Sequence, residues 1–346
     1  MNNIIQQYKK EKEKYEACCQ KIELLIKELL NIESIRYHKI ESRTKDIESL
    51  NKKIISKGGK YQNINDITDI VALRIITYFE DEVESVAKII NDNFIIDEMN
   101  SCDKRKLPLN EFGYRSLHYV VDLNTERQNL KEYERFKNIK IEIQIRSILQ
   151  HAWAEIEHDL GYKGVATVPD SFKRNFCMIA AQLEMADRDF IKLRDESLSY
   201  KEKSDTIIKN EISENLSIDS ISLTSFISNN KLIKEINNEI AQKWNLPISD
   251  STKKNIEYWI YLLDFFAIKD INTLFNKLEK YKNDIILLGK NFPEPINSII
   301  NGWPIPYLCY ALIMNEDINK QNEFFRDILS NNYYDYKKRI ENILNK

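Results

Sequence analysis

The most regular pattern in the chain is an alternation of isoleucine and polar residues from Ile139 to Arg146. A period of two predicts a β-strand, because successive side chains point to opposite faces of a sheet. One face of this strand would carry isoleucine, and the other would carry Lys140, Glu142, Gln144 and Arg146. A carboxylate, an amide and two cations on one face fit a site for a metal-bound nucleotide. They also fit the charged outer face of an edge strand.

The first half of the chain alternates between helical and strand patterns. This alternation predicts an α/β fold in which a mixed β-sheet is flanked by helices. A Gly58-Gly59 pair marks the end of the second helix. The predicted helices cover residues 3–33, 44–56, 81–91 and 147–161, and the predicted strands cover residues 66–79, 94–99, 114–123 and 139–146.

Helical spacing dominates after Pro169. A long amphipathic helix is predicted from residue 171 to 196, with an extension to about residue 210, and the Ser/Asn-rich stretch up to residue 230 indicates a linker. We therefore predict three parts, which are an α/β domain over 1–200, a helix end and linker over 201–230, and an all-α region over 231–346. The last part shows no catalytic spacing, so we expect it to regulate the first through a ligand, a partner protein or contacts with a second copy of the chain.

Composition narrows the class of protein. The 346 residues are 42% hydrophobic and 30% charged, and the net charge of −3 excludes a surface that coats nucleic acid in general. Five scattered cysteines without CxxC spacing argue against zinc and favour a reducing compartment. No apolar run is long enough to span a membrane, so we expect a cytoplasmic protein. The first 60 residues are basic, with 14 Lys/Arg against 9 Asp/Glu.

Five short motifs lie in a fixed order along the first half of the chain. They are Ser42-Arg43-Thr44-Lys45 with Ser49 and Lys53, Asp69-Ile70-Val71-Ala72-Leu73-Arg74, Phe112-Gly113-Tyr114-Arg115-Ser116-Leu117-His118-Tyr119, Glu142-Ile143-Gln144-Ile145-Arg146, and Trp153-Ala154-Glu155-Ile156-Glu157-His158 ending at Tyr162-Lys163. This set, over roughly residues 35 to 165, resembles the synthetase domain of the RelA/SpoT family. The resemblance implies a nucleotidyltransferase-like fold and transfer of pyrophosphate from ATP to the 3′-hydroxyl of GDP or GTP. The products would be AMP and the alarmones ppGpp and pppGpp.

The resemblance also implies which carboxylates act in catalysis. Asp69 would hold Mg²⁺, and Glu142 would help to bind the metal or take the proton of the attacking hydroxyl. Taken alone, Asp69 fits a strand-end carboxylate equally well. Asp69 and Arg74 are five positions apart, so a regular strand would put them on opposite faces. We therefore expect either that Asp69 precedes the strand or that a bulge shifts its phase.

The remaining site residues are implied as two groups of nucleotide ligands. Arg43 and Lys45 would lie at a helix start, with Lys53 about three turns along the same helix. The Tyr114 ring would stack on guanine, although an aromatic in a strand is also a common core residue. The ATP ligands would be Arg43, Lys45, Lys53 and Arg74, and the acceptor ligands would be Tyr114, His118, Gln144, Arg146 and His151.

The chain departs from the family pattern at several points. Ala72 replaces the usual glycine, and the cations Lys104, Arg105 and Lys106 lie further upstream of the Gly-Tyr pair than the usual lysine. About 40 residues precede Arg43, too few for the hydrolase domain of the long members, so we expect synthesis without hydrolysis.

Two other functions stay open at this point. A toxin-type relative would transfer pyrophosphate to the 3′ CCA end of tRNA or make adenosine alarmones, and the basic N-terminal segment fits an RNA backbone. A non-catalytic regulator would bind nucleotides only, but the presence of both Asp69 and Glu142 argues against it. The chain has no glycine-rich P-loop pattern, which disfavours a P-loop kinase.

Overall fold

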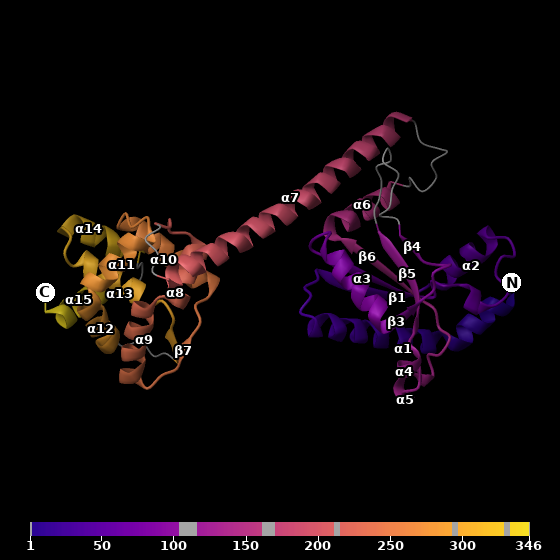
Figure 1. Ribbon diagram of the computed structural model, residues 1–346, viewed down its shortest axis with the longest axis horizontal. Helices are drawn as coiled ribbons and strands as arrows, with labels where there is room; N and C mark the ends of the chain where they lie inside the picture. Colours follow the sequence, from indigo (N-terminus) through magenta and orange to yellow (C-terminus); the bar gives the residue numbers. More distant parts are fainter. Residues whose placement is uncertain are drawn as a thin grey trace. The chain divides into compact units, whose positions relative to one another are not determined.

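The chain folds into two compact units that share one long helix. The computed structural model describes residues 2–103, 116–160, 170–210, 215–292, 297–328 and 333–345. The units are Met1–Arg194 and Asp195–Lys346, and the division between them falls inside helix α7 (Asp170–Lys209; Figure 1). The extension of this helix to about residue 210 is as the sequence predicted.

A mixed β-sheet forms the centre of the N-terminal unit. Its order is β1-β2-β6-β5-β3, with β4 paired to β5, and only the β2–β6 pair is parallel. The alternating strand β6 therefore lies between two neighbours, which excludes an edge strand with a charged outer face. The strands are β1 (Lys39–Thr44), β2 (Val71–Thr77), β3 (Phe94–Ile96), β4 (Cys102–Asp103), β5 (Leu117–Leu123) and β6 (Ile141–Ser147).

The isoleucine face of the sheet packs against helices α1 (Asn2–Ile32) and α3 (Glu82–Asn93; Figure 1). Ile141, Ile143 and Ile145 are fully buried in a cluster that includes side chains from both helices. Burial of each such side chain contributes about 1.5–3 kcal/mol. The apolar face is therefore occupied by packing, and the polar face of β6 points the other way.

Short helices surround this core, and all of them except α5 begin at a residue whose side chain caps the helix. Asp46 accepts from the Ser49 backbone at the start of α2. Ser147 and Gln150 form a reciprocal capping box at the start of α6, where four backbone N–H groups need partners. These helices are α2 (Ile47–Ser56), the 3₁₀ turn η1 (Ile64–Asp66), α4 (Thr125–Gln128), α5 (Lys131–Glu134) and α6 (Ile148–Asp159).

Two expectations about this unit have different outcomes. The prediction of a helix from residue 44 was wrong at its start, because Arg43 and Thr44 end strand β1 and α2 begins only at Ile47. Pairing with β2 overrides the local helical pattern there. The expected irregularity around Asp69 is confirmed, because Asp69 lies in a turn before β2 begins.

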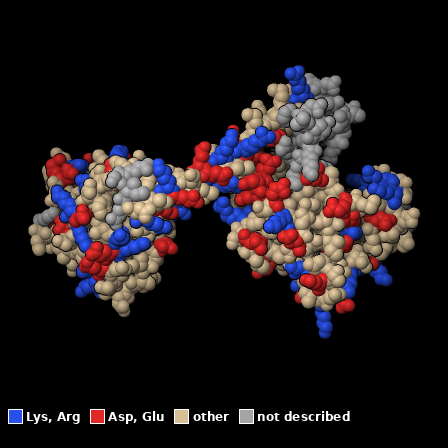
Figure 2. Space-filling model, in the orientation of Figure 1, with Lys and Arg blue, Asp and Glu red and all other residues tan. Residues whose placement is uncertain are grey.

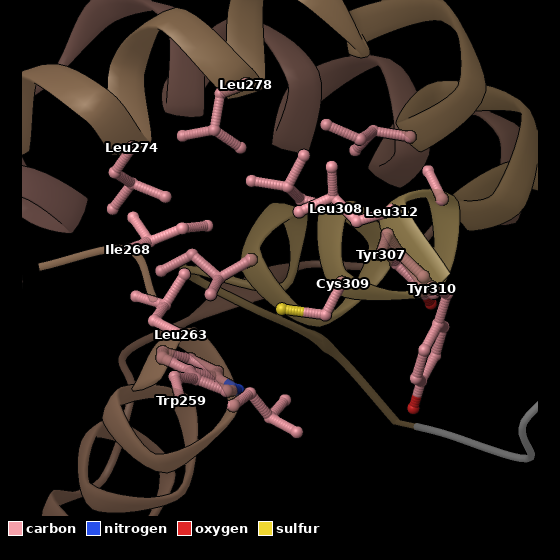
Figure 3. Packing of buried hydrophobic residues seen from close by; sticks show 14 of the residues in the cluster. Trp259, Leu263, Ile268, Leu274, Leu278, Tyr307, Leu308, Cys309, Tyr310 and Leu312 are labelled. Carbon is pink, nitrogen blue, oxygen red and sulfur yellow. The ribbon is translucent and has the colours of Figure 1, made fainter. Parts of the chain in front are cut away.

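The C-terminal unit is largely helical around its own apolar core. The core contains the nearly continuously buried helix α13, and Figure 3 shows Leu308 and Cys309 of this helix beside Trp259 and Leu263. Two very short parallel strands, β7 (Ile248–Ser249) and β8 (Ile299–Ile300), complete the unit. Its helices are α8 (Ser220–Asn229), α9 (Lys231–Trp244), α10 (Lys253–Phe265), α11 (Ile271–Lys280), α12 (Lys282–Asn291), α13 (Pro304–Ile313), α14 (Ile318–Glu323), the π-helical turn η2 (Phe324–Ile328) and α15 (Tyr333–Leu344).

The predicted helix end agrees with α7, which runs to Lys209, but the Ser/Asn-rich stretch read as a linker up to residue 230 contains a helix. Residues 220–229 form helix α8, which Asp219 caps and which buries Leu223, Phe226 and Ile227 in the C-terminal core. The serines of this segment suggested a linker, but several are part of a folded helix.

None of the helices in the described ranges is both long enough and apolar enough to cross a bilayer.

Candidate active site

The polar face of the sheet brings the predicted donor and catalytic residues into one row. Arg43 on β1 pairs in register with Ala72 on β2, and Ala72 pairs with Glu142 on β6. Residues in register share a face, and neighbouring strands are about 4.8 Å apart. A second row runs beside it, in which Arg74 pairs with Gln144 and Gln144 pairs with His118.

Asp69 lies between two lysines at the start of β2. Lys45 Nζ is 2.6 Å from Asp69 Oδ2, and Lys53 Nζ is 2.9 Å from Asp69 Oδ1. Lys45 follows β1 and Lys53 comes from α2, so two elements converge on one carboxylate. The Tyr8 hydroxyl of α1 donates to the Lys45 carbonyl and holds this segment in place.

Glu142 is the best-connected carboxylate of the polar face. Gln144 Nε2 donates to Glu142 Oε1 over 3.0 Å, and His118 Nδ1 lies 3.3 Å from the same oxygen. On its other side, His118 Nε2 lies 2.6 Å from Ser116 Oγ. Burial would raise the pKa of Glu142, but the hydrogen bonds from His118 and Gln144 and the charge of Lys53 lower that pKa to about 2. Glu142 is therefore ionised at neutral pH, and Lys53 acts on both predicted catalytic carboxylates.

Arg74 and its neighbours form a second charged group beside the row. Arg74 donates to Glu155 of α6 over 2.8 Å and lies 3.5 Å from Glu41 of β1. His151 Nδ1 lies 3.7 Å from the same Glu155. Burial, together with the charges of Arg74 and Arg146, lowers the pKa of His151 and favours its neutral form.

A pocket of about 270 Å³ opens between these two groups, over strands β1 and β2. Arg43 and Arg74 line it on either side of Ala72, with Gln144 at one end. Two guanidinium groups beside a small side chain suit a flat aromatic ring that stacks on them. The alanine that replaces the usual glycine is part of this lining, so its methyl group reduces the space available there.

Arg146 connects the polar face to helices α6 and α7. Its guanidinium donates to the Gln144 amide oxygen, and its carbonyl lies 3.4 Å from Thr77 Oγ1. The next residue, Ser147, donates to Asp187 of α7 over 2.7 Å. This hydrogen bond ties the end of β6 to α7.

Most of the predicted site residues gather on this one face. His118 and Gln144 both contact Glu142, and Arg146 donates to Gln144. Tyr114 and the cations Lys104–Lys106 lie outside the described residues. His151 lies beside Arg74 as well as Arg146, so its assignment to the acceptor stays a prediction, as do the roles of the other site residues.

Three polar residues in the site had no predicted role. Ser116 contacts His118, and Glu41 and Glu155 pair with Arg74. Glu41 was missed because strand β1 was missed. Glu155 belongs to the fifth motif, and in the structure it forms an ion pair with Arg74.

Metal binding at this face would rest on Asp69 and Glu142. Within the described ranges no three His, Cys, Asp or Glu side chains are grouped as the ligands of a metal ion. Two carboxylates are nevertheless enough for an ion that takes its other ligands from water and substrate phosphates, as Mg²⁺ does.

Comparison with known proteins supports a specific family for this domain. The model of the region found in RelA/SpoT proteins matches residues 42–167, which contain the end of strand β1, strands β2 to β6 and helix α6. Residues 42–167 are therefore similar to the region found in RelA/SpoT proteins.

Two curated relatives come from Bacillus subtilis strain 168. The chain is 28% identical over 160 residues to GTP pyrophosphokinase YjbM, a match that covers 45% of this chain and 72% of the relative. It is 32% identical over 132 residues to GTP pyrophosphokinase YwaC, covering 37% of this chain and 60% of the relative. Both matches leave more than half of this chain uncovered.

Solved structures give similar coverage. Small alarmone synthetase 1 from Bacillus subtilis is 23% identical, with a TM-score of 0.45, and covers 56% of this chain and 99% of that one. The same synthetase bound to its product pppGpp has a TM-score of 0.46 at 23% identity, covering 55% and 98%.

Proposed function

We propose that the RelA/SpoT domain transfers pyrophosphate from ATP to the 3′-hydroxyl of GDP or GTP. The 3′-oxygen attacks the β-phosphorus of ATP, and the bond from that phosphorus to the bridging oxygen of AMP breaks. The acceptor gains the pyrophosphate, its hydroxyl proton passes to a base, and AMP leaves. The observation that carries the proposal is the row Arg43–Ala72–Glu142, flanked by the Lys45–Asp69–Lys53 group.

The donor side has the groups that ATP requires. The adenine ring would occupy the pocket between Arg43 and Arg74, where guanidinium groups can stack on it. The triphosphate would extend towards Lys45 and Lys53, whose ammonium groups now neutralise Asp69. Phosphoryl transfer depends chiefly on positioning and on neutralisation of charge, and these four cations supply both.

The two carboxylates fit a magnesium ion. Asp69 lies just before β2, Glu142 is on the adjacent strand β6, and Lys53 acts on both of them. Bound Mg²⁺ would add charge neutralisation at the phosphates, with Asp69 and Glu142 as its protein ligands. The low pKa of Glu142 supports this role over that of general base, because a carboxylate that ionises so readily is a weak proton acceptor.

The acceptor would lie on the β5 side of the row. His118, Gln144 and Arg146 present hydrogen-bond groups there, and Tyr114 belongs to the same motif in sequence. His118 has its Nδ1 against Glu142 and its Nε2 against Ser116, so its ring orientation is fixed from both sides. An acceptor base held by these groups would bring its 3′-hydroxyl towards the carboxylates.

A direct assay tests the proposal. The purified full chain is incubated with magnesium and ATP labelled in its γ-phosphate, and GDP, GTP, ATP and deacylated tRNA are offered one at a time. We expect label in GDP or GTP, with AMP formed in equal amount. The absence of label in all four acceptors would contradict the proposed transfer.

One surface feature favours tRNA as a second candidate acceptor. Lys52, Lys57 and Lys60 are exposed on and just after α2, the helix that supplies Lys53 to the site (Figure 2). A basic surface next to a pyrophosphate-transfer site suits the backbone of an RNA strand that enters it. In the same assay, label in tRNA and none in GDP or GTP would favour this candidate.

The two candidates also respond differently to salt. Lysine contacts with RNA phosphates make binding weaken steeply as salt rises. Replacement of Lys52, Lys57 and Lys60 by alanine should flatten that slope if the acceptor is tRNA. The same triple variant should leave the use of GTP unchanged, because none of the three lysines is predicted to contact a mononucleotide.

A further inference from the structure

The C-terminal unit contains a pocket of about 450 Å³ that is separate from the site on the sheet. Every residue that lines it belongs to the unit 195–346. Sites for small molecules typically have volumes of about 300–1,000 Å³, with mostly apolar walls and a few polar groups. The pocket has that size, and both apolar and charged residues line it.

Apolar side chains from four segments form the walls. Ile207 and Ile208 come from the end of α7, Leu216 from the segment that follows, Phe226 from α8 and Ile271 from the start of α11. Each of the five is buried. Backbone hydrogen bonds fix two of the segments to each other, since Ile271 N donates to the Leu216 carbonyl over 2.9 Å. The cavity is therefore enclosed by ordered elements and favours an apolar guest.

Charged residues also line the pocket, and Lys282 is the least exposed of them. Lys231, Glu235 and Glu279 are exposed, whereas Lys282 at the start of α12 is only half-buried. Lys282 Nζ lies 2.7 Å from Glu235, and the side chains are 30% and 56% exposed respectively. Such surface ion pairs are worth little, so Glu235 can return to water while Lys282 accepts another anion.

We propose that this pocket binds a small amphipathic organic anion. Its apolar body, an acyl chain or an aromatic ring system, would fill the space between α7, α8 and α11. Its carboxylate or similar head group would replace Glu235 as the partner of Lys282. This inference concerns the C-terminal unit alone, so it stands whether or not the proposed transfer reaction is correct.

The test is calorimetric titration of the full chain with sodium decanoate below its micelle-forming concentration. Lys282→Met keeps the length of the side chain and removes its charge, and Asn272→Trp places a large ring at the mouth of the pocket. Lys254→Met is the matched control, because Lys254 is an exposed lysine of the same unit that does not line the pocket. Circular dichroism and a thermal melt of each variant confirm that it is folded.

We expect saturable binding at one site in the parent chain and in Lys254→Met. Lys282→Met should bind about two- to fivefold more weakly, as loss of one partly exposed ion pair predicts, and Asn272→Trp should show no binding. No saturable binding by the parent, or full binding by Asn272→Trp, would overturn the site. Equal binding by Lys282→Met and the parent would overturn the assignment of an anion.

Discussion

The two units of the chain use their polar residues in opposite ways. In the N-terminal unit, cations and carboxylates gather on one face of a sheet whose other face is filled with isoleucine. In the C-terminal unit, the described polar groups mostly cap helices, as Asp219, Thr252 and Asp270 do, while apolar side chains form the interior. Charged side chains gathered on one face of a rigid sheet indicate a catalytic or binding site. Polar side chains at helix ends indicate a role in stabilising the fold.

We therefore place the proposed transfer reaction in the first unit and the proposed ligand site in the second. Each variant below tests that division, because it should affect one unit and leave the other unchanged.

The largest expected effect is that of Asp69→Asn. Loss of this carboxylate removes a predicted magnesium ligand, so kcat should fall by at least about a hundredfold. Lys45 and Lys53 would then face the ATP phosphates without their counter-charge, so the KM for ATP should not rise. Steady-state kinetics measures both constants, and the exposed Asp92→Asn is the matched control. A kcat within a few-fold of the parent would exclude Asp69 from catalysis.

Arg43→Ala and Arg74→Ala should act on the donor side only. If the two guanidinium groups stack on adenine, each loss should raise the KM for ATP by about 2- to 30-fold. The KM for the acceptor should change little, and the exposed Arg36→Ala should change neither constant. A rise in the acceptor KM instead of the ATP KM would contradict the assignment of this pocket to adenine.

Gly289→Ala should destabilise the C-terminal unit without an effect on transfer. A Cβ atom at Gly289 would lie 2.3 Å from Ile240 Cδ1, a side chain buried in the core of the unit. Overpacking of this kind costs about 1–3 kcal/mol. Calorimetry should show a lower melting transition for this unit, while activity measured below that transition stays within twofold of the parent. A parallel loss of activity would show that the units are not independent.

The smallest expected effect is a pH-dependent change at Asp187. Burial, with the nearby charge of Glu80, raises the pKa of Asp187 to about 6 despite the hydrogen bond from Ser147. The folded chain then binds a proton more tightly than the unfolded chain, so stability falls as the pH rises towards 6 and stays lower above it. Asp187→Asn keeps an acceptor for Ser147 and removes the charge. The melting temperature should rise by a few degrees at pH 8 and much less at pH 5, and an equal change at both would contradict this reading.

The strand and helix pattern of the N-terminal unit could largely be predicted from the sequence, because local periodicity specifies it. The alternation from Ile139 to Arg146 predicted strand β6. The five-residue spacing from Asp69 to Arg74 predicted that Asp69 either precedes strand β2 or is shifted in phase by a bulge, and the structure has the first arrangement. Strand β1 was missed because its partner is far away in sequence, with Ile40 pairing to Ile75. The residues around Arg43 show a helical pattern, because helix α2 begins shortly after them. Strand β1 therefore forms through its pairing with β2, which the local sequence does not indicate.

The contacts within the site were less predictable than its residues. The motif set named Glu142, His118 and Arg74, but pairwise contacts depend on register across the sheet. The ion pair between Arg74 and Glu155 joins residues far apart in sequence, and no local signal indicates it. Helix α8 was missed for a related reason, since its serines favour a linker while Phe226 and Ile227 fold only against the rest of the C-terminal core.

The most direct test of the central claim is the transfer rate of Glu142→Gln. Glutamine keeps the size of the side chain and can still contact Gln144 and His118, but it removes the charge that the low pKa of Glu142 preserves. The exposed Glu132→Gln is the control. With labelled ATP and the acceptor that the parent uses, we predict at least about a hundredfold loss in Glu142→Gln, full activity in the control and unchanged melting of the C-terminal unit. Activity of Glu142→Gln within a few-fold of the parent would contradict the assignment of pyrophosphate transfer to this face of the sheet.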